Sequence, residues 1–301
     1  MKVNVLLSTY NGETYIKEQL DSLLKQTLII DTNIIIRDDG STDNTLKIIE
    51  EYIKDHPNIR YYTGENLTSG KSFWNLLQNS DEADYFAFCD QDDVWDEDKL
   101  EVAINSLKEH DDIPALYFSD ARVVDSQLNL VSKTVTHENF SITYPHSLLG
   151  NMYPGCTYIF NKKAWELCKQ LDVTNIDFDI HDWTVYKIVA CFGKVILDKR
   201  PHMSYRQHGD NIMGFHNKIK RILHSFTIFH KKNRGLRRKN ALILENAYED
   251  MMSEENREIT HAIAHYNKDR KCKKFITHSK CFKFPGVKYH LFMLLVRINI
   301  L

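Results

Sequence analysis

Short apolar runs alternate with amphipathic segments along the first two thirds of the chain. Four of the apolar runs have the composition of strands buried on both faces, at residues 3–8, 33–37, 59–63 and 85–89. Between them, apolar residues recur at helical spacing at residues 14–26, in a segment ending near residue 52, and at residues 71–78. Strands that alternate with helices predict an α/β fold, a mostly parallel sheet with helices on both faces.

The alternation continues less regularly to about residue 200. Further strands are predicted at residues 115–124, 157–160 and 194–198. Further helices are predicted at residues 97–110, 162–171 and 181–191. Beyond these segments the sequence has the pattern of helix almost throughout.

Charge divides the chain into two parts. Residues 216–301 carry 19 Lys and Arg against 7 Asp and Glu, whereas residues 1–215 carry 20 against 34. The basic part holds clusters such as Lys231, Lys232, Arg234, Arg237, Arg238 and Lys239. We therefore predict an α/β domain over residues 1–214 and a basic helical region over residues 215–301. That region contacts either an anionic membrane surface or a second subunit, and the charge pattern leaves both open.

Composition favours a globular chain in the cytoplasm. Apolar residues make up 43% of the sequence, which is ample for a packed core. The first residues do not resemble a secretory signal, and no window approaches the roughly 18–20 apolar residues of a spanning helix. The six cysteines form no C-x-x-C pair, so we expect free thiols rather than disulfides or zinc ligands.

The strand at residues 85–89 runs directly into three carboxylates, Asp90, Asp92 and Asp93. Ligands bind at such strand ends in open α/β sheets, and Mg²⁺ or Mn²⁺ relieves the repulsion among clustered carboxylates. Asp-x-Asp therefore indicates a site for a metal and a diphosphate. The alternative is that Asp93 and Asp96 cap the helix that follows.

A second acidic turn follows the strand at residues 33–37. Asp39 is placed to accept hydrogen bonds from a base or ribose, and Tyr10, at the end of the first strand, is placed to stack on a base. Alone, each has a structural alternative, Asp39 as a turn residue and Tyr10 as a core aromatic. Together with Asp90 and Asp92 they favour a nucleotide-diphosphate donor.

Three motifs in this order and spacing resemble those of glycosyltransferase family 2. They are STYNGE at residues 8–13, DDGSTD at 38–43 and DQDD at 90–93 with Trp95 after it. The resemblance covers about residues 1–214 and implies a GT-A nucleotide-sugar fold, in the rhamnosyltransferase-like branch that builds bacterial surface polysaccharides. It implies that a nucleotide-diphosphate-sugar is bound by residues of these motifs, namely Thr9, Tyr10, Asn11, Glu13, Asp39, Asp90 and Gln91.

The same resemblance implies roles for residues outside the nucleotide motifs. Asp92 would ligate Mn²⁺ or Mg²⁺, and His208, in the segment Arg206 to Asn211, would complete the metal site. Asn66 and Lys71 fall where the family's donor-side loop lies, with a solvated loop as an equal interpretation. Residues 150–156 have the position of an acceptor-side loop, and a simple turn is the alternative.

His181-Asp182-Trp183 resembles the family's catalytic segment, which makes Asp182 the expected general base. Such a carboxylate takes a proton from the acceptor hydroxyl as it attacks the anomeric carbon, so that one displacement inverts the configuration. Its structural alternative is a favourable charge in the first turn of a helix. The family's processive members carry Gln-x-x-Arg-Trp, which this sequence lacks. We therefore expect transfer of one sugar to a glycan acceptor that is linked to a lipid carrier at the inner membrane face.

Two other classes of function are weighed against this one. A nucleotidyltransferase needs a Gly-rich basic loop near the first strand, which Tyr10 to Glu13 does not provide. A module that binds nucleic acid through the basic region is disfavoured because the remaining chain is acidic. His261 and His265, at i and i+4 with Glu258 one turn earlier, have the spacing of metal ligands but are interpreted as a surface helix.

Overall fold

The computed structural model describes residues 1–28, 31–135, 141–151, 153–172, 181–208, 235–283 and 287–301, and these form two compact units. The first comprises Met1–His137, Asn151–Val189 and Gly193–Gly214. The second comprises Glu138–Gly150, Ala190–Phe192 and Phe215–Leu301. The boundary expected at Gly214 and the basic residues Lys231, Lys232 and Arg234 lie outside the described residues.

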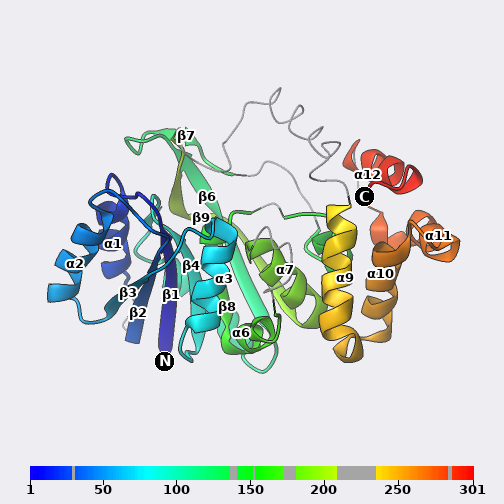
Figure 1. The fold of residues 1–301 in the computed structure, drawn as a ribbon, viewed down its shortest axis with the longest axis horizontal. Helices are drawn as coiled ribbons and strands as arrows, with labels where there is room; N and C mark the ends of the chain where they lie inside the picture. The colour runs from blue at the N-terminus through cyan, green and yellow to red at the C-terminus, as the bar shows by residue number, and fades with distance from the viewer. Residues whose placement is uncertain (29–30, 136–140, 152, 173–180, 209–234, 284–286) are drawn as a thin grey trace. The chain divides into compact units, whose positions relative to one another are not determined.

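A twisted mixed sheet forms the centre of the first unit (Figure 1). Its order in the described chain is β3-β2-β1-β4-β8-β6-β9-β5, and β7 pairs with β6. The strands are β1 (Lys2–Thr9), β2 (Asp31–Asp38), β3 (Ile59–Thr63), β4 (Tyr85–Asp90), β5 (Val94–Trp95), β6 (Ala115–Val124), β7 (Leu130–Ser132), β8 (Tyr158–Asn161) and β9 (Lys194–Arg206). β3, β2, β1 and β4 are parallel, while β8 is antiparallel to both its neighbours.

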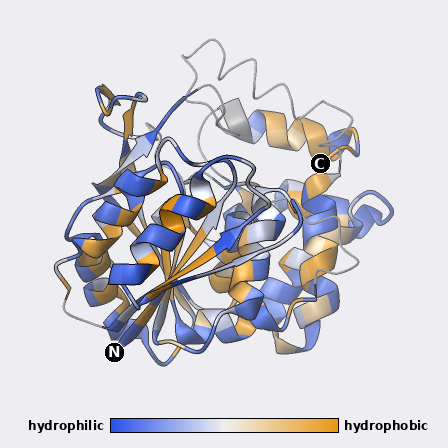
Figure 2. Ribbon diagram, turned by 60° about the vertical axis from the view of Figure 1, so that its left-hand side comes forward, coloured by the Kyte–Doolittle hydropathy of each residue, from blue (hydrophilic) through white to orange (hydrophobic). Residues whose placement is uncertain are grey.

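Helices of the first unit cover both faces of this sheet. They are α1 (Ile16–Leu24), α2 (Thr45–Asp55), α3 (Ser69–Asn79), α4 (Lys99–Leu107), α6 (Lys162–Lys169) and α7 (His181–Phe192), with short 3₁₀ turns η1 (Lys108–His110) and η2 (Gly155–Thr157). Val5 and Leu7 of β1 share a core with α1, α2 and α4. On the other face, Phe86 of β4 stacks on Trp165 of α6 with ring centroids 5.0 Å apart. Figure 2 shows the matching pattern, apolar strands between helices that are apolar on one side.

Helices make up most of the second unit. They are α5 (Tyr144–Ser147), α9 (Leu236–Tyr248), α10 (Glu254–His265), α11 (Arg270–His278) and α12 (Val287–Arg297), with 3₁₀ turns η5 (Glu249–Met251) and η6 (Lys280–Phe282). α10 packs against α9 and α11, and Tyr144 Oη lies 2.5 Å from Thr260 Oγ1. No helix in the described part of the chain is long and apolar enough to cross a bilayer.

The predicted α/β fold is confirmed, and the differences lie at the edges of elements. β9 was expected to end at Asp198 but continues to Arg206, because its second half pairs with β5 and β6. β5 and β7 were not predicted, since two or three residues are too few to show a period. The expected free thiols agree with six unpaired cysteines, five of them buried.

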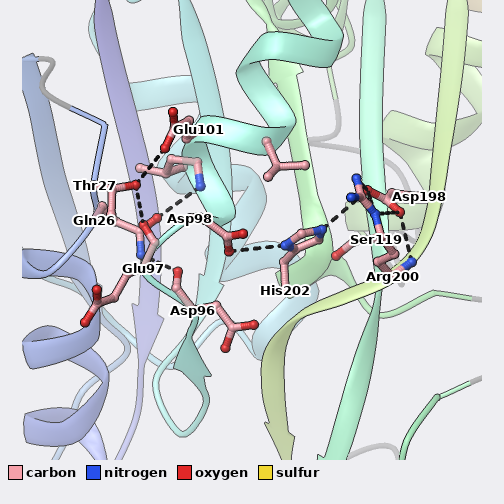
Figure 3. Close-up of polar contacts among 12 residues, drawn as sticks. Gln26, Thr27, Asp96, Glu97, Asp98, Glu101, Ser119, Asp198, Arg200 and His202 are labelled. Carbon is pink, nitrogen blue, oxygen red and sulfur yellow. Dashed lines mark hydrogen bonds and ion pairs between the residues drawn. The ribbon is translucent and has the colours of Figure 1, made fainter.

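The alternative of Asp93 and Asp96 as helix caps is wrong. α4 begins at Lys99 after Asp98, and no side chain caps it. Asp96 instead forms an ion pair with Arg122. His202 lies between two other carboxylates, with Nδ1 3.2 Å from Asp98 Oδ1 and Nε2 3.4 Å from Asp198 Oδ2 (Figure 3). These contacts fix the β5–β9 edge of the sheet.

Gly193 joins α7 to β9 at a point where two backbones nearly touch. A Cβ atom there would lie 1.8 Å from the carbonyl oxygen of Pro114, and backbone cannot move aside as a flexible side chain can. We predict that Gly193→Ala lowers the free energy of unfolding by about 1–3 kcal/mol, the usual cost of overpacking. Urea unfolding of the full chain measures it. Gly150→Ala, where no atom lies within 4 Å of the new Cβ, is the control, and equal midpoints for the two variants would contradict the prediction.

Candidate functional site

The carboxyl ends of β1, β2 and β4 meet at one edge of the sheet. In the parallel register Ser8 is beside Asp90 and Thr9 is beside Asp38. The Asp39 amide donates to the Thr9 carbonyl at 2.8 Å, which extends the pairing by one residue. The residues that the sequence placed on three separate strand ends are therefore neighbours.

Gln91 fastens the end of β1 to the end of β4. Its Oε1 accepts hydrogen bonds from Thr9 Oγ1 at 2.6 Å and from the Tyr10 amide at 2.9 Å, and its Nε2 donates to the Tyr10 carbonyl. A Cβ on Gly12 would come within 2.3 Å of Gln91 Oε1, so a larger residue there would push the Gln91 amide out of these hydrogen bonds. Gln91 and Thr9 thus position the loop through contacts with each other.

Asn11 and Glu13 bind the loop after β1 to the loop after β2. The Asn11 amide donates to Ser41 Oγ and its Oδ1 accepts from the Thr42 amide, both at 2.8 Å. Glu13 Oε2 accepts from the backbone and side-chain nitrogens of Asn44, at 2.8 and 2.7 Å. These side chains therefore shape the loops between which Tyr10 is presented. Tyr10 itself is 46% exposed.

Asp39 is buried, and its carboxylate already has partners in the protein. It forms an ion pair with Arg37 and accepts hydrogen bonds from the amides of Leu67 and Thr68, at 3.0 and 3.1 Å. It therefore holds the segment that carries Asn66, whose Oδ1 accepts from the Thr68 amide at 3.2 Å. Lys71 is exposed in the first turn of α3.

The three carboxylates after β4 lie close enough to perturb one another. Burial and then the Asp92 charge raise the pKa of Asp90 to about 7. Burial followed by Asp92 and Asp90 raises the pKa of Asp93 well above its usual value. Asp93 is fully buried and accepts a hydrogen bond from the Arg206 amide at 3.0 Å. Such accumulated negative charge favours a cation in this place.

His208 lies beside Asp92, as the sequence predicted. Its Nε2 is 2.7 Å from Asp92 Oδ2, and both side chains are 13% exposed. The ring of Tyr15 lies 4.9 Å from the His208 ring. The rest of the predicted segment, Gly209 to Asn211, is outside the described residues.

Arg206 is a residue of this site that the sequence did not single out. Its Nε donates to the Asp92 carbonyl at 2.7 Å, its guanidinium lies 4.6 Å from the centre of the Tyr15 ring, and it pairs with Glu18. Arg206 therefore fixes the backbone of the acidic loop at Asp92. The available signal was that Arg206 lies two residues before His208, the expected metal ligand. The residues that Arg206 contacts, however, are distant in sequence.

Lys99 and Cys156 are buried next to the acidic group of Asp90, Asp92 and Asp93. Burial lowers the pKa of Lys99 to about 8, and its Nζ donates to the Cys156 carbonyl and lies 3.5 Å from the centre of the Trp95 ring. The Cys156 thiol lies among the carboxylates of Asp90 and Asp93, all within 4.8 Å of one another. Burial and these two charges raise the pKa of that thiol well above its usual value, so it stays protonated.

Asp182 occupies the first turn of α7 and is 8% exposed. Burial raises its pKa to about 6, opposed by hydrogen bonds from the Trp183 backbone, the Asn151 side chain and the Gly155 backbone. A Cβ at Gly155 would lie 2.9 Å from Asp182 Cβ. Gly155 thus packs against Asp182, and the next residue, Cys156, places its thiol beside Asp90 and Asp93, so Asp182 lies near the acidic group after β4.

Lys187, one turn further along α7, is a buried cation that the sequence did not reveal. Its Nζ lies 4.5 Å from the centre of the Trp183 ring. Burial lowers the pKa of Lys187 to about 7, and Asp182 opposes this shift. A basic residue inside an apolar helical run was the only signal for it.

Two kinds of chemistry become available in this arrangement. Asp92 and His208 bring a carboxylate oxygen and an imidazole nitrogen within 2.7 Å of each other, and Asp90 is two residues away along the chain. Oxygen donors with an imidazole are ligand types that Mg²⁺ or Mn²⁺ accepts. Asp182, with its pKa at about 6, is suited to accept a proton near neutral pH.

Comparison with known proteins identifies the kind of enzyme that carries such a site. The model of the family described as glycosyl transferase family 2 matches residues 4–169, more than half of the chain. The dTDP-rhamnosyl transferase RfbG of Shigella flexneri is 34% identical over 239 residues, which are 72% of this chain and 78% of the relative.

Solved structures show the same fold. TarS 1-349 of S. aureus, in complex with UDP-GlcNAc, aligns with a TM-score of 0.61 at 18% identity, over 98% of this chain and 79% of TarS. The mannosyltransferase PcManGT of Pyrobaculum calidifontis, in complex with GDP-Man and Mn²⁺, aligns with a TM-score of 0.51 at 14% identity, over 98% of this chain and 84% of that one. The fold is that of GT-A glycosyltransferases, and the chain belongs to glycosyl transferase family 2.

Proposed function

We propose that this glycosyltransferase is metal-dependent and inverting, and that it moves one sugar from a nucleotide-diphosphate donor to a lipid-linked glycan in surface-polysaccharide synthesis. The observation that carries the proposal is the position of Asp182, which packs against Gly155 while the next residue, Cys156, has its thiol within 4.8 Å of the Asp90 and Asp93 carboxylates. Because the relative with 34% identity is a dTDP-rhamnosyl transferase, dTDP-rhamnose is the first donor to test.

The donor lies, in this proposal, along the ends of β1, β2 and β4. Tyr10 stacks on the base from its exposed position, while Asp39 contributes by holding the segment after β3 through Leu67 and Thr68. Thr9, Asn11, Glu13 and Gln91 keep the loops in place. Lys71 and Asn66, both exposed beside this segment, are available to the donor's polar groups.

The diphosphate needs positive charge, and the described loop after β4 offers it carboxylates instead. Asp92 and His208 would hold Mn²⁺ or Mg²⁺, with Asp90 beside them. When bound, the metal neutralises charge that develops on the departing diphosphate. Arg206 keeps the Asp92 backbone fixed, so the ligands are positioned before the ion arrives.

Asp182 supplies the general base. It takes the proton of the acceptor hydroxyl while that oxygen bonds to the anomeric carbon and the carbon's bond to the nucleoside diphosphate breaks. One displacement on the face opposite the leaving group inverts the anomeric configuration. Gly155 and Asn151 orient Asp182 by hydrogen bonds, which gives residues 150–156 a place on the acceptor side.

Incubation of the purified chain with dTDP-rhamnose, UDP-GlcNAc and GDP-Man tests the donor and the metal together. We expect release of nucleoside diphosphate only with Mn²⁺ or Mg²⁺, fastest from dTDP-rhamnose. Asp92→Asn should slow it at least about 100-fold, because transition-state charge loses several kcal/mol of stabilisation. The exposed Asp55→Asn is the matched control. Full turnover in excess chelator would remove the metal from the mechanism.

Asp182→Asn should lose about 10²- to 10⁴-fold in transfer while donor binding, measured by calorimetry, is retained. In the unaltered enzyme kcat/KM should rise with pH through about 6, because only the deprotonated form of Asp182 accepts a proton and burial has raised its pKa in the free enzyme to that value. Loss of donor binding in parallel with rate would assign Asp182 a structural role. Retention of the anomeric configuration, read by NMR of the product, would rule out a single displacement.

The basic helical region docks, we propose, on the anionic inner face of the cell membrane. Lys271 and Lys274 are exposed one turn apart on α11, whose opposite side buries Cys272 and Ile276. Arg237 is less available, since its Nε donates to the Leu149 carbonyl at 2.6 Å. A contact between subunits is the competing use of this surface.

Replacing Lys271 and Lys274 together by Gln should weaken co-sedimentation with anionic vesicles at low salt, by roughly thirtyfold at most, since each basic residue contributes about 1 kcal/mol near the surface. High salt should remove the difference. The exposed Lys17 and Lys47, replaced in the same way, are the control pair. Equal binding by all three proteins, or a dimer lost with the α11 lysines, would overturn the membrane role.

A further inference from the structure

Two histidines and a glutamate converge in the helical unit. Glu245 comes from α9, and His261 and His265 come from consecutive turns of α10. His261 Nδ1 lies 2.7 Å from Glu245 Oε1, and His265 Nε2 lies 2.7 Å from Glu245 Oε2. The two imidazole rings are 4.4 Å apart, centre to centre.

The geometry of this trio is that of a chelating set. Residues at i and i+4 share one face of a helix, so both imidazoles reach the same point in space. One nitrogen of each ring and a carboxylate oxygen of Glu245 all lie within 4.8 Å of one another. Ligands of tetrahedral zinc are about 3.3 Å apart, given bonds of about 2.0–2.1 Å, so small side-chain rotations suffice.

The three side chains differ in burial: Glu245 is buried, whereas the two histidines are partly exposed and have more freedom to rotate. The Glu245 side chain is 9% exposed, whereas His261 and His265 are 53% and 36% exposed. A buried carboxylate is costly to desolvate, and a divalent cation bound between this carboxylate and the two imidazoles would compensate its charge. The exposed histidines leave an entry path and room for a water ligand.

We propose that Glu245, His261 and His265 form a zinc site that clamps α9 to α10. Two imidazoles and one carboxylate favour Zn²⁺ over Mg²⁺ and Mn²⁺, which prefer all-oxygen sets. The expected role is structural, because the three ligands come from two helices that pack directly on one another. The sequence showed the histidines but indicated Glu258 as their neighbour, and the carboxylate that meets them is 16 residues before His261.

The test measures Zn²⁺ binding to the full chain carrying Asp92→Asn, in a large excess of Mg²⁺, so that the donor-side metal site does not contribute. We expect one Zn²⁺ per chain, tetrahedral absorption bands when Co²⁺ replaces it, and a higher Tm with Zn²⁺ than after chelation. His261→Ala and His265→Ala should each weaken Zn²⁺ binding by at least about 10- to 100-fold, the usual loss when only a residue that supports a zinc ligand is replaced.

The exposed His278 on α11 provides the control, and His278→Ala should bind Zn²⁺ as the parent does. Glu245→Gln tests the third ligand, and a folded chain by circular dichroism with no zinc-dependent Tm supports the site. Absence of stoichiometric Zn²⁺ in the parent would overturn the proposal. Binding that is unchanged in both His261→Ala and His265→Ala would overturn it as well.

Discussion

Repulsion among buried carboxylates is the constraint on which this enzyme's centre depends. Asp90, Asp92 and Asp93 follow one strand, and burial together with their mutual repulsion raises the pKa of Asp90 and of Asp93. Arg206 and Lys99 hold the surrounding backbone through hydrogen bonds to the carbonyl oxygens of Asp92 and of Cys156. The fold therefore fixes the loop without relieving that repulsion, and a bound cation would relieve it by favouring the charged carboxylates.

Much of this could be predicted because the governing signals are local. Apolar runs and helical spacing identified the elements of the α/β fold, and the register of parallel strands then brought Thr9, Asp39 and Asp90 together. The pairing of Asp92 with His208 followed from motif order, although 116 residues separate them. The family model matches residues 4–169, a range that contains the motifs at the ends of β1, β2 and β4.

The contacts that were missed all depend on side chains distant in sequence. The sequence neighbours of Arg206 do not indicate that its side chain contacts Glu18 and Tyr15. The apolar sequence around Lys187 likewise does not indicate that its side chain lies against the Trp183 ring. Several motif residues that were expected to bind the donor also make hydrogen bonds within the protein. Asn11, Glu13 and Gln91 bind neighbouring loops, so these motif residues help to shape the site.

Gly155 and Cys156 lie between Asp182 and the carboxylates that follow β4. The Gly155 backbone donates to Asp182, and the next residue places its thiol among Asp90 and Asp93. A substitution at either of these two consecutive residues therefore alters the surroundings of Asp182 and of Asp90 together. The two carboxylates cannot be tuned independently through this dipeptide.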